Sequence, residues 1–188
     1  IRKETPMGWI ILAVLVALVL VVIGMYNSLV RLRASSESAW ADIDVQLKRR
    51  YDLIPNLVET VKAYAAHEKG ALEAVITARA KAMSAQGPEA KAVAENQLSQ
   101  SLKSLFALAE AYPQLRAVEA FNQLQGSLNQ VEDALQNARR YYNAVVRDYN
   151  AKRQEVPTNF IAGWFNFAGR QFFELTETTQ REPPRVQF

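Results

Sequence analysis

MGWIILAVLVALVLVVIGMY, the segment from Met7 to Tyr26, contains no charged side chain in its 20 residues. A helix of this length spans about 30 Å, at a rise of about 1.5 Å per residue, and so matches the hydrocarbon core of a bilayer. Trp9 and Tyr26 stand near its ends, where aromatic rings prefer the membrane–water interface. A signal peptide has a shorter apolar core, and a soluble helix normally carries a polar stripe. The segment is therefore predicted to be a transmembrane helix, which makes the chain a single-pass protein of the cell membrane.

The basic residues on either side of this segment bear on its orientation. Arg2 and Lys3 precede it, with Glu4 beside them, and Arg31 and Arg33 follow it. Lysine and arginine accumulate on the cytoplasmic side of membrane helices. The balance here is small, but it favours a cytoplasmic position for the residues that follow the segment.

The composition of the rest of the chain favours helices and excludes several kinds of site. Gly and Pro number 7 each, which is poor material for the turns of a many-stranded β domain. The absence of cysteine excludes disulfides, thiolate metal sites and cysteine nucleophiles. His67 is the only histidine and is interpreted as a solvated helix position. Since neither a zinc signature nor a glycine-rich phosphate loop occurs, we expect no enzymatic activity, cofactor, metal or small-molecule substrate.

Charged residues are interleaved along the chain and do not form an obvious site. Acidic residues gather early in the chain, but a Ca²⁺ loop would need alternating ligands around a glycine, so we interpret them as a charged outer face: Asp42, Asp44, Asp52 and Glu59. The net charge is only +3, and Arg139-Arg140-Tyr141-Tyr142 is a short basic-aromatic patch. We therefore expect no binding to nucleic acid.

Apolar periodicity predicts how the helix continues beyond the membrane. No Gly or Pro occurs between Gly24 and Pro55, so the transmembrane helix is expected to continue through residues 35–38, with a flexible serine joint as the alternative. Apolar residues then recur at spacings of three and four, as on one buried helix face: Trp40, Ile43, Leu47, Tyr51, Ile54, Leu57, Val58 and Val61. This helix is predicted to reach about Ser84. A kink is expected at Pro55, which has no N–H to donate to the Tyr51 carbonyl.

Two further helices follow with the same period. Gln86-Gly87-Pro88 marks a turn, because proline suits the first position of a new helix. The next stripe runs to the interruption at Tyr112-Pro113: Leu98, Leu102, Leu105, Ala109 and Tyr112. The third helix has a seam of about four heptads: Phe121, Leu124, Leu128, Val131, Leu135, Ala138, Tyr142, Val145 and Tyr149.

An aromatic segment follows Pro157. Thr158 is expected to cap a fourth helix, in which the apolar side chains spread over about 160°, wider than the roughly 100° needed to pack on one bundle. Something besides the bundle core should then cover Phe165, Phe172 and Phe173, which form a candidate interface. We favour a second subunit as the cover. The alternatives are an irregular helix that buries all three rings, a different protein, or lipid, which we rank low because the segment follows a long helix and is expected to lie far from the bilayer.

Together these elements predict an all-α chain. It has an anchor over residues 1–30, an elongated antiparallel bundle of about four helices over residues 31–180, and an extended tail over residues 181–188.

Two long motifs resemble the LemA family. The first is RRYDLIPNLVETVKAYAAHE, residues 49–68, and the second is AVVRDYN, residues 144–150, followed by VPTN and FFE at residues 156–159 and 172–174. The resemblance implies a helical bundle on a membrane anchor, usually described in the cytoplasm. Members of the family are often encoded near membrane zinc proteases of the heat-shock HtpX type, so the resemblance suggests such a protease as a partner, and it implies no catalytic residue. Asp52, Pro55, Asn56 and His67 match the family motif, and we interpret them as structural.

Two classes of function fit these observations. The first is a membrane-anchored scaffold or interaction protein that acts through helix surfaces and assembles as a homo-oligomer. The second is a signalling module that transmits a membrane event to a protease or kinase, with the uninterrupted helix before Pro55 as the transmitter. An insertion of Gly-Gly-Ser near Ser36 separates the two, because only the transmitter depends on an unbroken helix.

Overall fold

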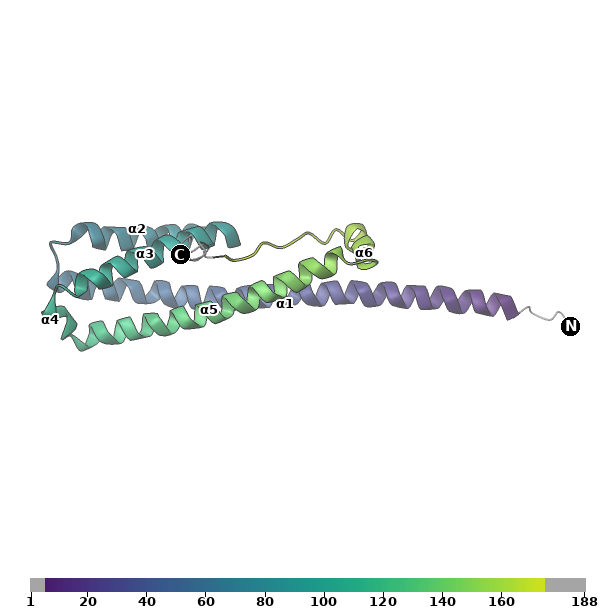
Figure 1. Cartoon of the computed structure of the whole chain (residues 1–188), viewed down its shortest axis with the longest axis horizontal. Helices are drawn as coiled ribbons and strands as arrows, with labels where there is room; N and C mark the ends of the chain where they lie inside the picture. Colours follow the sequence, from purple (N-terminus) through teal and green to yellow (C-terminus); the bar gives the residue numbers. More distant parts are fainter. Residues whose placement is uncertain (1–5, 175–188) are drawn as a thin grey trace, which may run out of the picture. The chain divides into compact units, whose positions relative to one another are not determined.

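The computed structural model describes residues 6–174, and its regular structure is helical throughout (Figure 1). The elements are α1 (Pro6–Tyr64), α2 (Lys69–Ser84), α3 (Pro88–Ala109), α4 (Pro113–Arg116), α5 (Glu119–Gln154) and α6 (Thr158–Trp164). No strand occurs among the described residues, so the prediction of an all-α chain with a helical bundle is confirmed. The predicted tail over residues 181–188 lies outside the described part of the chain.

The chain divides into two compact units, which we describe separately. The first unit combines Ile1–Trp40 with Tyr142–Arg170, and the second combines Ala41–Tyr141 with Gln171–Phe188. The domain boundaries expected at residues 30 and 180 do not coincide with this division and stay predictions.

The first helix continues without interruption beyond the apolar segment, as predicted. α1 includes residues 35–38, where Ser36 is fully buried and its hydroxyl donates a hydrogen bond to the Arg33 carbonyl at 2.7 Å. A serine that bonds to the preceding turn in this way is compatible with a helix interior. Apart from the partly buried Met25, the side chains of the apolar segment are exposed, and α1 is the one helix of the described residues that is long and apolar enough to cross a membrane.

The prediction that this helix reaches Ser84 is wrong. α1 ends at Tyr64, the chain turns over residues 65–68, and α2 then packs against α3 (Figure 1). The Tyr112 hydroxyl donates a hydrogen bond to the Glu68 carboxylate at 2.9 Å, which ties this turn to the turn after α3. The turn allows α2 to bury its own apolar face: Leu72, Val75, Ala78 and Ala82.

Pro55 lies inside α1, and α2 compensates for its missing N–H. The carbonyl of Tyr51 is the group that an N–H at position 55 would bond. Arg79 Nε donates to that carbonyl oxygen at 2.8 Å instead. Asp52 and Asn56, which flank the site in sequence, both have exposed side chains. The contact that stabilises α1 at this proline therefore comes from α2.

The later helices follow the predicted stripes. α3 begins at Pro88, directly after Gly87, whose φ of 79° is a left-handed conformation that favours glycine. On α5 most of the predicted seam is buried, and Leu124 and Ala138 are partly buried. In the first unit, a small core forms from Leu29, Tyr149, Ile161, Ala162 and Phe167.

α6 is shorter than predicted, and its end explains why. Asn166 has a φ of 56°, the Phe167 N–H donates to the Ala162 carbonyl at 2.9 Å, and the Asn166 N–H donates to the Gly163 carbonyl at 3.3 Å. This pair of bonds around a left-handed residue is the Schellman motif that ends helices. Thr158 is the first residue of α6 and is buried, and the N-cap residue is Pro157, which makes no side-chain cap hydrogen bond, so the prediction that Thr158 caps this helix is wrong. Positions beyond Trp164 therefore do not follow a helical period.

Candidate functional site

A buried polar cluster joins α1, α3 and α5 within the second unit. Glu95 of α3 is fully buried and accepts hydrogen bonds from two neighbours on α1, from Arg50 Nη1 at 2.8 Å and from the Tyr51 hydroxyl. Arg50 Nη2 also donates to Ser99 Oγ at 2.8 Å and lies 3.3 Å from a carboxylate oxygen of Glu132 on α5. The guanidinium thus meets partners from two helices other than its own.

The electrostatics of this cluster reflect its burial. Removal from water raises the pKa of Glu95, and the hydrogen bonds from Tyr51 and Arg50 oppose that rise. Burial and donation to Glu95 raise the pKa of the Tyr51 hydroxyl. A buried ion pair of this kind is costly to break, because Glu95 without Arg50 would be a buried charge with no cationic partner, while Arg50 without Glu95 would keep only Ser99 and Glu132. The cluster therefore fixes which faces of α1, α3 and α5 meet.

Sequence reasoning missed this cluster although its signal is present. Arg50 falls between Leu47 and Ile54 at spacings of three and four, and Glu95 precedes Leu98 by three. Both are charged residues at positions of apolar stripes, where a charge must find a partner. The signal identifies each residue alone, while their pairing depends on how the helices pack.

A cleft of about 400 Å³ opens beside the cluster in the same unit. Three basic side chains and one acidic side chain contribute to its lining: Arg50, Lys103, Arg139 and Glu132. Phe106 and Leu128 add apolar surface. Apart from Arg50 of α1, all lining residues belong to α3 or α5, so the cleft lies between these two helices.

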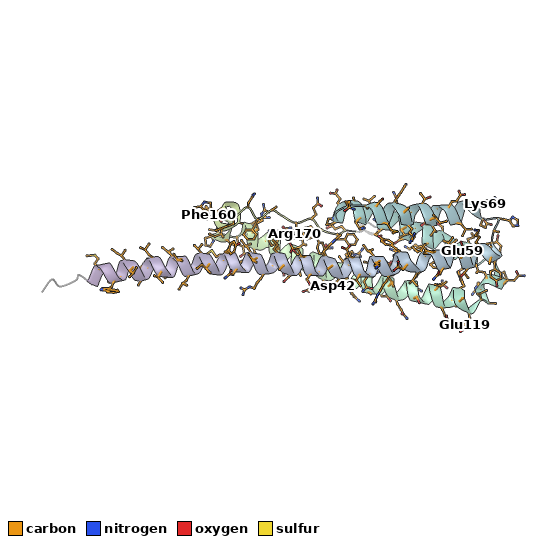
Figure 2. The ribbon with its side chains drawn as sticks, turned by 180° about the vertical axis from the view of Figure 1, so that it is seen from behind. Asp42, Glu59, Lys69, Glu119, Phe160 and Arg170 are labelled. Atoms are coloured by element: carbon orange, nitrogen blue, oxygen red, sulfur yellow. The ribbon has the colours of Figure 1, made fainter. Side chains whose placement is uncertain are left out.

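The acidic residues and the histidine that were predicted to be solvent-exposed lie at the surface. The acidic residues expected on an outer face are all exposed; Asp42 and Glu59 are labelled on α1 in Figure 2. His67 is exposed as expected, but it lies in the turn between α1 and α2 and not in a helix. Among the described residues no group of His, Asp and Glu is arranged to hold a metal ion.

The candidate interface residues do not form one helical surface. Phe165 is 55% exposed in the first unit, Phe172 is 39% exposed in the second unit, and Phe173 is fully buried there. Phe173 is therefore removed from the candidate surface, because the chain already covers it. Whether a partner covers Phe165 or Phe172 stays a prediction.

The aromatic surface of the first unit centres on α6 instead. Phe160, labelled in Figure 2, is 67% exposed and Trp164 is 85% exposed. The ring of Phe165 contacts Tyr26, with centroids 4.8 Å apart. Tyr26 is the last residue of the apolar segment Met7–Tyr26, so the expectation that these aromatics lie far from that segment is wrong.

Comparison with known proteins identifies the family. Residues 39–188 match the LemA family. Magnetosome proteins MamQ 1 and MamQ 2 of Paramagnetospirillum magneticum are each 23% identical to this chain, over 85% of it and 68% of their own length. Magnetosome protein MamQ of Magnetospirillum gryphiswaldense is 22% identical over the same shares. Since the match covers most of the chain, including both motifs noted above, this protein belongs to the LemA family.

Proposed function

We propose that this protein is a membrane-anchored helical scaffold that acts through its helix surfaces and assembles with copies of itself. One observation carries the proposal. The helix whose first part is the exposed apolar segment also supplies core side chains that are at most 1% exposed: Ile43, Leu47, Ile54, Leu57 and Val61. Anchor and core are parts of one element, which suits a protein that holds a binding surface at a membrane.

The proposed location is the cell membrane, with one span over residues 7–26 and the bundle in the cytoplasm. The exposed apolar side chains of the span support the location, and the basic pair Arg31 and Arg33 supports the orientation. Carbonate washing tests the span, because an integral protein stays with the membrane. Because the chain has no cysteine, an exposed Ser38→Cys variant tests the orientation: a membrane-impermeant maleimide should label it only in opened cells.

Self-assembly and partner binding are tested on the full chain. Purification in mild detergent, followed by light scattering, should give a particle mass of at least two chains. Mass spectrometry of the same sample should find a membrane zinc protease, the partner that the family resemblance implies. A single-chain mass in detergent and in lipid discs would refute self-assembly.

The alternative is a signalling module, and the continuity of α1 through residues 35–38 favours it as a second candidate. A Gly-Gly-Ser insertion after Ser36 interrupts this helix. A matched control places the same insertion after Gln86, in the turn between α2 and α3. A scaffold should keep its membrane location, mass and partners with either insertion. A transmitter should lose regulation of its protease or kinase only with the first.

A further inference from the structure

The first unit presents three large aromatic side chains to solvent within six residues. Phe160, Trp164 and Phe165 are 67%, 85% and 55% exposed, and Trp164 is the most exposed large hydrophobic side chain of the described residues. Their neighbours on α6, Ile161 and Ala162, are buried in the small core. The rings of Phe160 and Trp164 are therefore surplus to the packing of α6.

This aromatic surface, which we define as Phe160, Trp164 and Phe165, is positioned by contacts with α1. Leu29 belongs to the same core as Ile161 and Ala162, and Met25 packs against it. Tyr26 makes edge-to-face contacts with Phe165 at 4.8 Å and with Phe167 at 5.6 Å. Each of these α1 residues lies at or just beyond the end of the apolar segment, residues 7–26.

The chemistry of the surroundings matches the boundary of a bilayer. Residues 156–169 contain no charged side chain. Arg31 is exposed five residues beyond Tyr26, about 7.5 Å further along the helix axis, where lipid headgroups would follow the hydrocarbon core. Tryptophan and other aromatic rings are enriched at this level of membrane proteins.

We propose that the aromatic surface inserts into the headgroup–acyl boundary of the leaflet in which α1 leaves the bilayer, as a second membrane contact beside the span. This inference rests on the proposed membrane anchor. If residues 7–26 span the hydrocarbon core, their contact with α6 brings Trp164 and Phe165 to the interface. An aromatic surface that would be costly in water is then buried in lipid.

The three tryptophans of the chain provide the test and its controls. Three variants each keep one tryptophan and replace the other two by phenylalanine. Trp9 lies inside the apolar segment and serves as the positive control. Trp40 lies 14 residues beyond Tyr26, about 21 Å along α1, and serves as the negative control. The full-length variants are reconstituted in phosphatidylcholine vesicles with and without bromine on the acyl chains, which quenches indole fluorescence at short range.

The expected result is strong quenching of Trp9 and Trp164 by brominated lipid and little quenching of Trp40. If Trp9 is quenched and Trp164 is not, the interfacial contact is refuted while the anchor stands. If Trp9 is not quenched, the anchor itself is refuted. A third outcome is that neither acrylamide nor brominated lipid quenches Trp164, and that acrylamide quenches it again when added lipid lowers the protein-to-lipid ratio. In that case a second copy of the chain covers the aromatic surface, and the lipid proposal is wrong.

Two of these variants replace Trp40, which is partly buried and contacts Tyr142, and this replacement could disturb the fold. A variant with one exposed substitution avoids that problem. The Trp164→Phe variant changes only an exposed position. The difference in bromine quenching between this variant and the unmodified protein reports on Trp164 alone, and equal quenching of the two would overturn the proposal.

Discussion

Replacing Glu95 by alanine is expected to lower the free energy of unfolding by about 3–5 kcal/mol, the range for removal of one partner from a buried ion pair. Arg50 would keep Ser99 at 2.8 Å and Glu132 at 3.3 Å, so the loss from the guanidinium alone is partial. The Tyr51 hydroxyl would lose its acceptor, and an unsatisfied buried donor costs about 1–3 kcal/mol. The two losses together place the expected value within the range.

Two companion variants separate the charge from the shape. Glu95→Gln keeps the volume and one acceptor, and should cost about 1–3 kcal/mol. The double variant Arg50→Met, Glu95→Leu leaves no buried charge, and should be less destabilised than Glu95→Ala. The assay is urea unfolding of the full-length protein in mild detergent, followed by far-ultraviolet circular dichroism. A Glu95→Ala variant as stable as the unmodified protein would refute the assigned role of the cluster.

Three further outcomes are expected from the packing. Leu128→Ala should lose about 2–5 kcal/mol through lost burial and a cavity, while the exposed Gln130→Ala should stay within about 0.5 kcal/mol; equal melting temperatures would contradict the seam. Arg79→Ala should lower the free energy of unfolding by about 1–3 kcal/mol, because it leaves the Tyr51 carbonyl unpaired. Adding Pro55→Ala should recover part of that loss, because an N–H returns at position 55. A double variant no more stable than Arg79→Ala would contradict the pairing of Arg79 with this carbonyl. Because folding raises the pKa of the Tyr51 hydroxyl, its protonated form stabilises the protein fully below about pH 10, and this stabilisation falls as the pH rises further, by at most about 1.4 kcal/mol per pH unit. The unmodified protein should therefore lose more free energy of unfolding between pH 9 and 11 than the Tyr51→Phe variant. Equal losses in the two proteins would contradict this role of Tyr51.

The sequence predicted those parts of the fold that depend on local periodicity. The 3,4 spacing around Leu47 and Leu128 identified buried helix faces, and Gly87-Pro88 identified the start of α3. The end of α1 was missed because Ala65-Ala66-His67-Glu68 contains no helix breaker, and the turn depends on the packing of α2. A left-handed Asn166 was likewise not foreseen, since asparagine is also compatible with a helix interior.

The candidate site was predicted less well, because it depends on contacts between distant segments. Arg50 and Glu95 are 45 residues apart, and only the packed helices show that they pair. Phe165 and Tyr26 are further apart still, and their contact relocates the aromatic surface from a remote end to the end of the apolar segment. Phe173 was misassigned because its expected angle assumed that the helix continues through residue 173. The helix in fact ends at Trp164.

The bond from Arg79 to the Tyr51 carbonyl has a consequence for the order in which the chain matures. During synthesis the helix around Pro55 emerges with one carbonyl unpaired, and its partner is 28 residues further along. We expect water to bond this carbonyl until α2 emerges and docks, so that the bonding of this part of α1 within the protein is complete only then. The same hydrogen bond should link the local unfolding of α1 near Pro55 to that of α2 in the native protein. Amide protons near Pro55 and those of α2 should then exchange with solvent as one cooperative unit. We therefore expect the proline inside α1 to couple the opening of this part of the helix to that of α2.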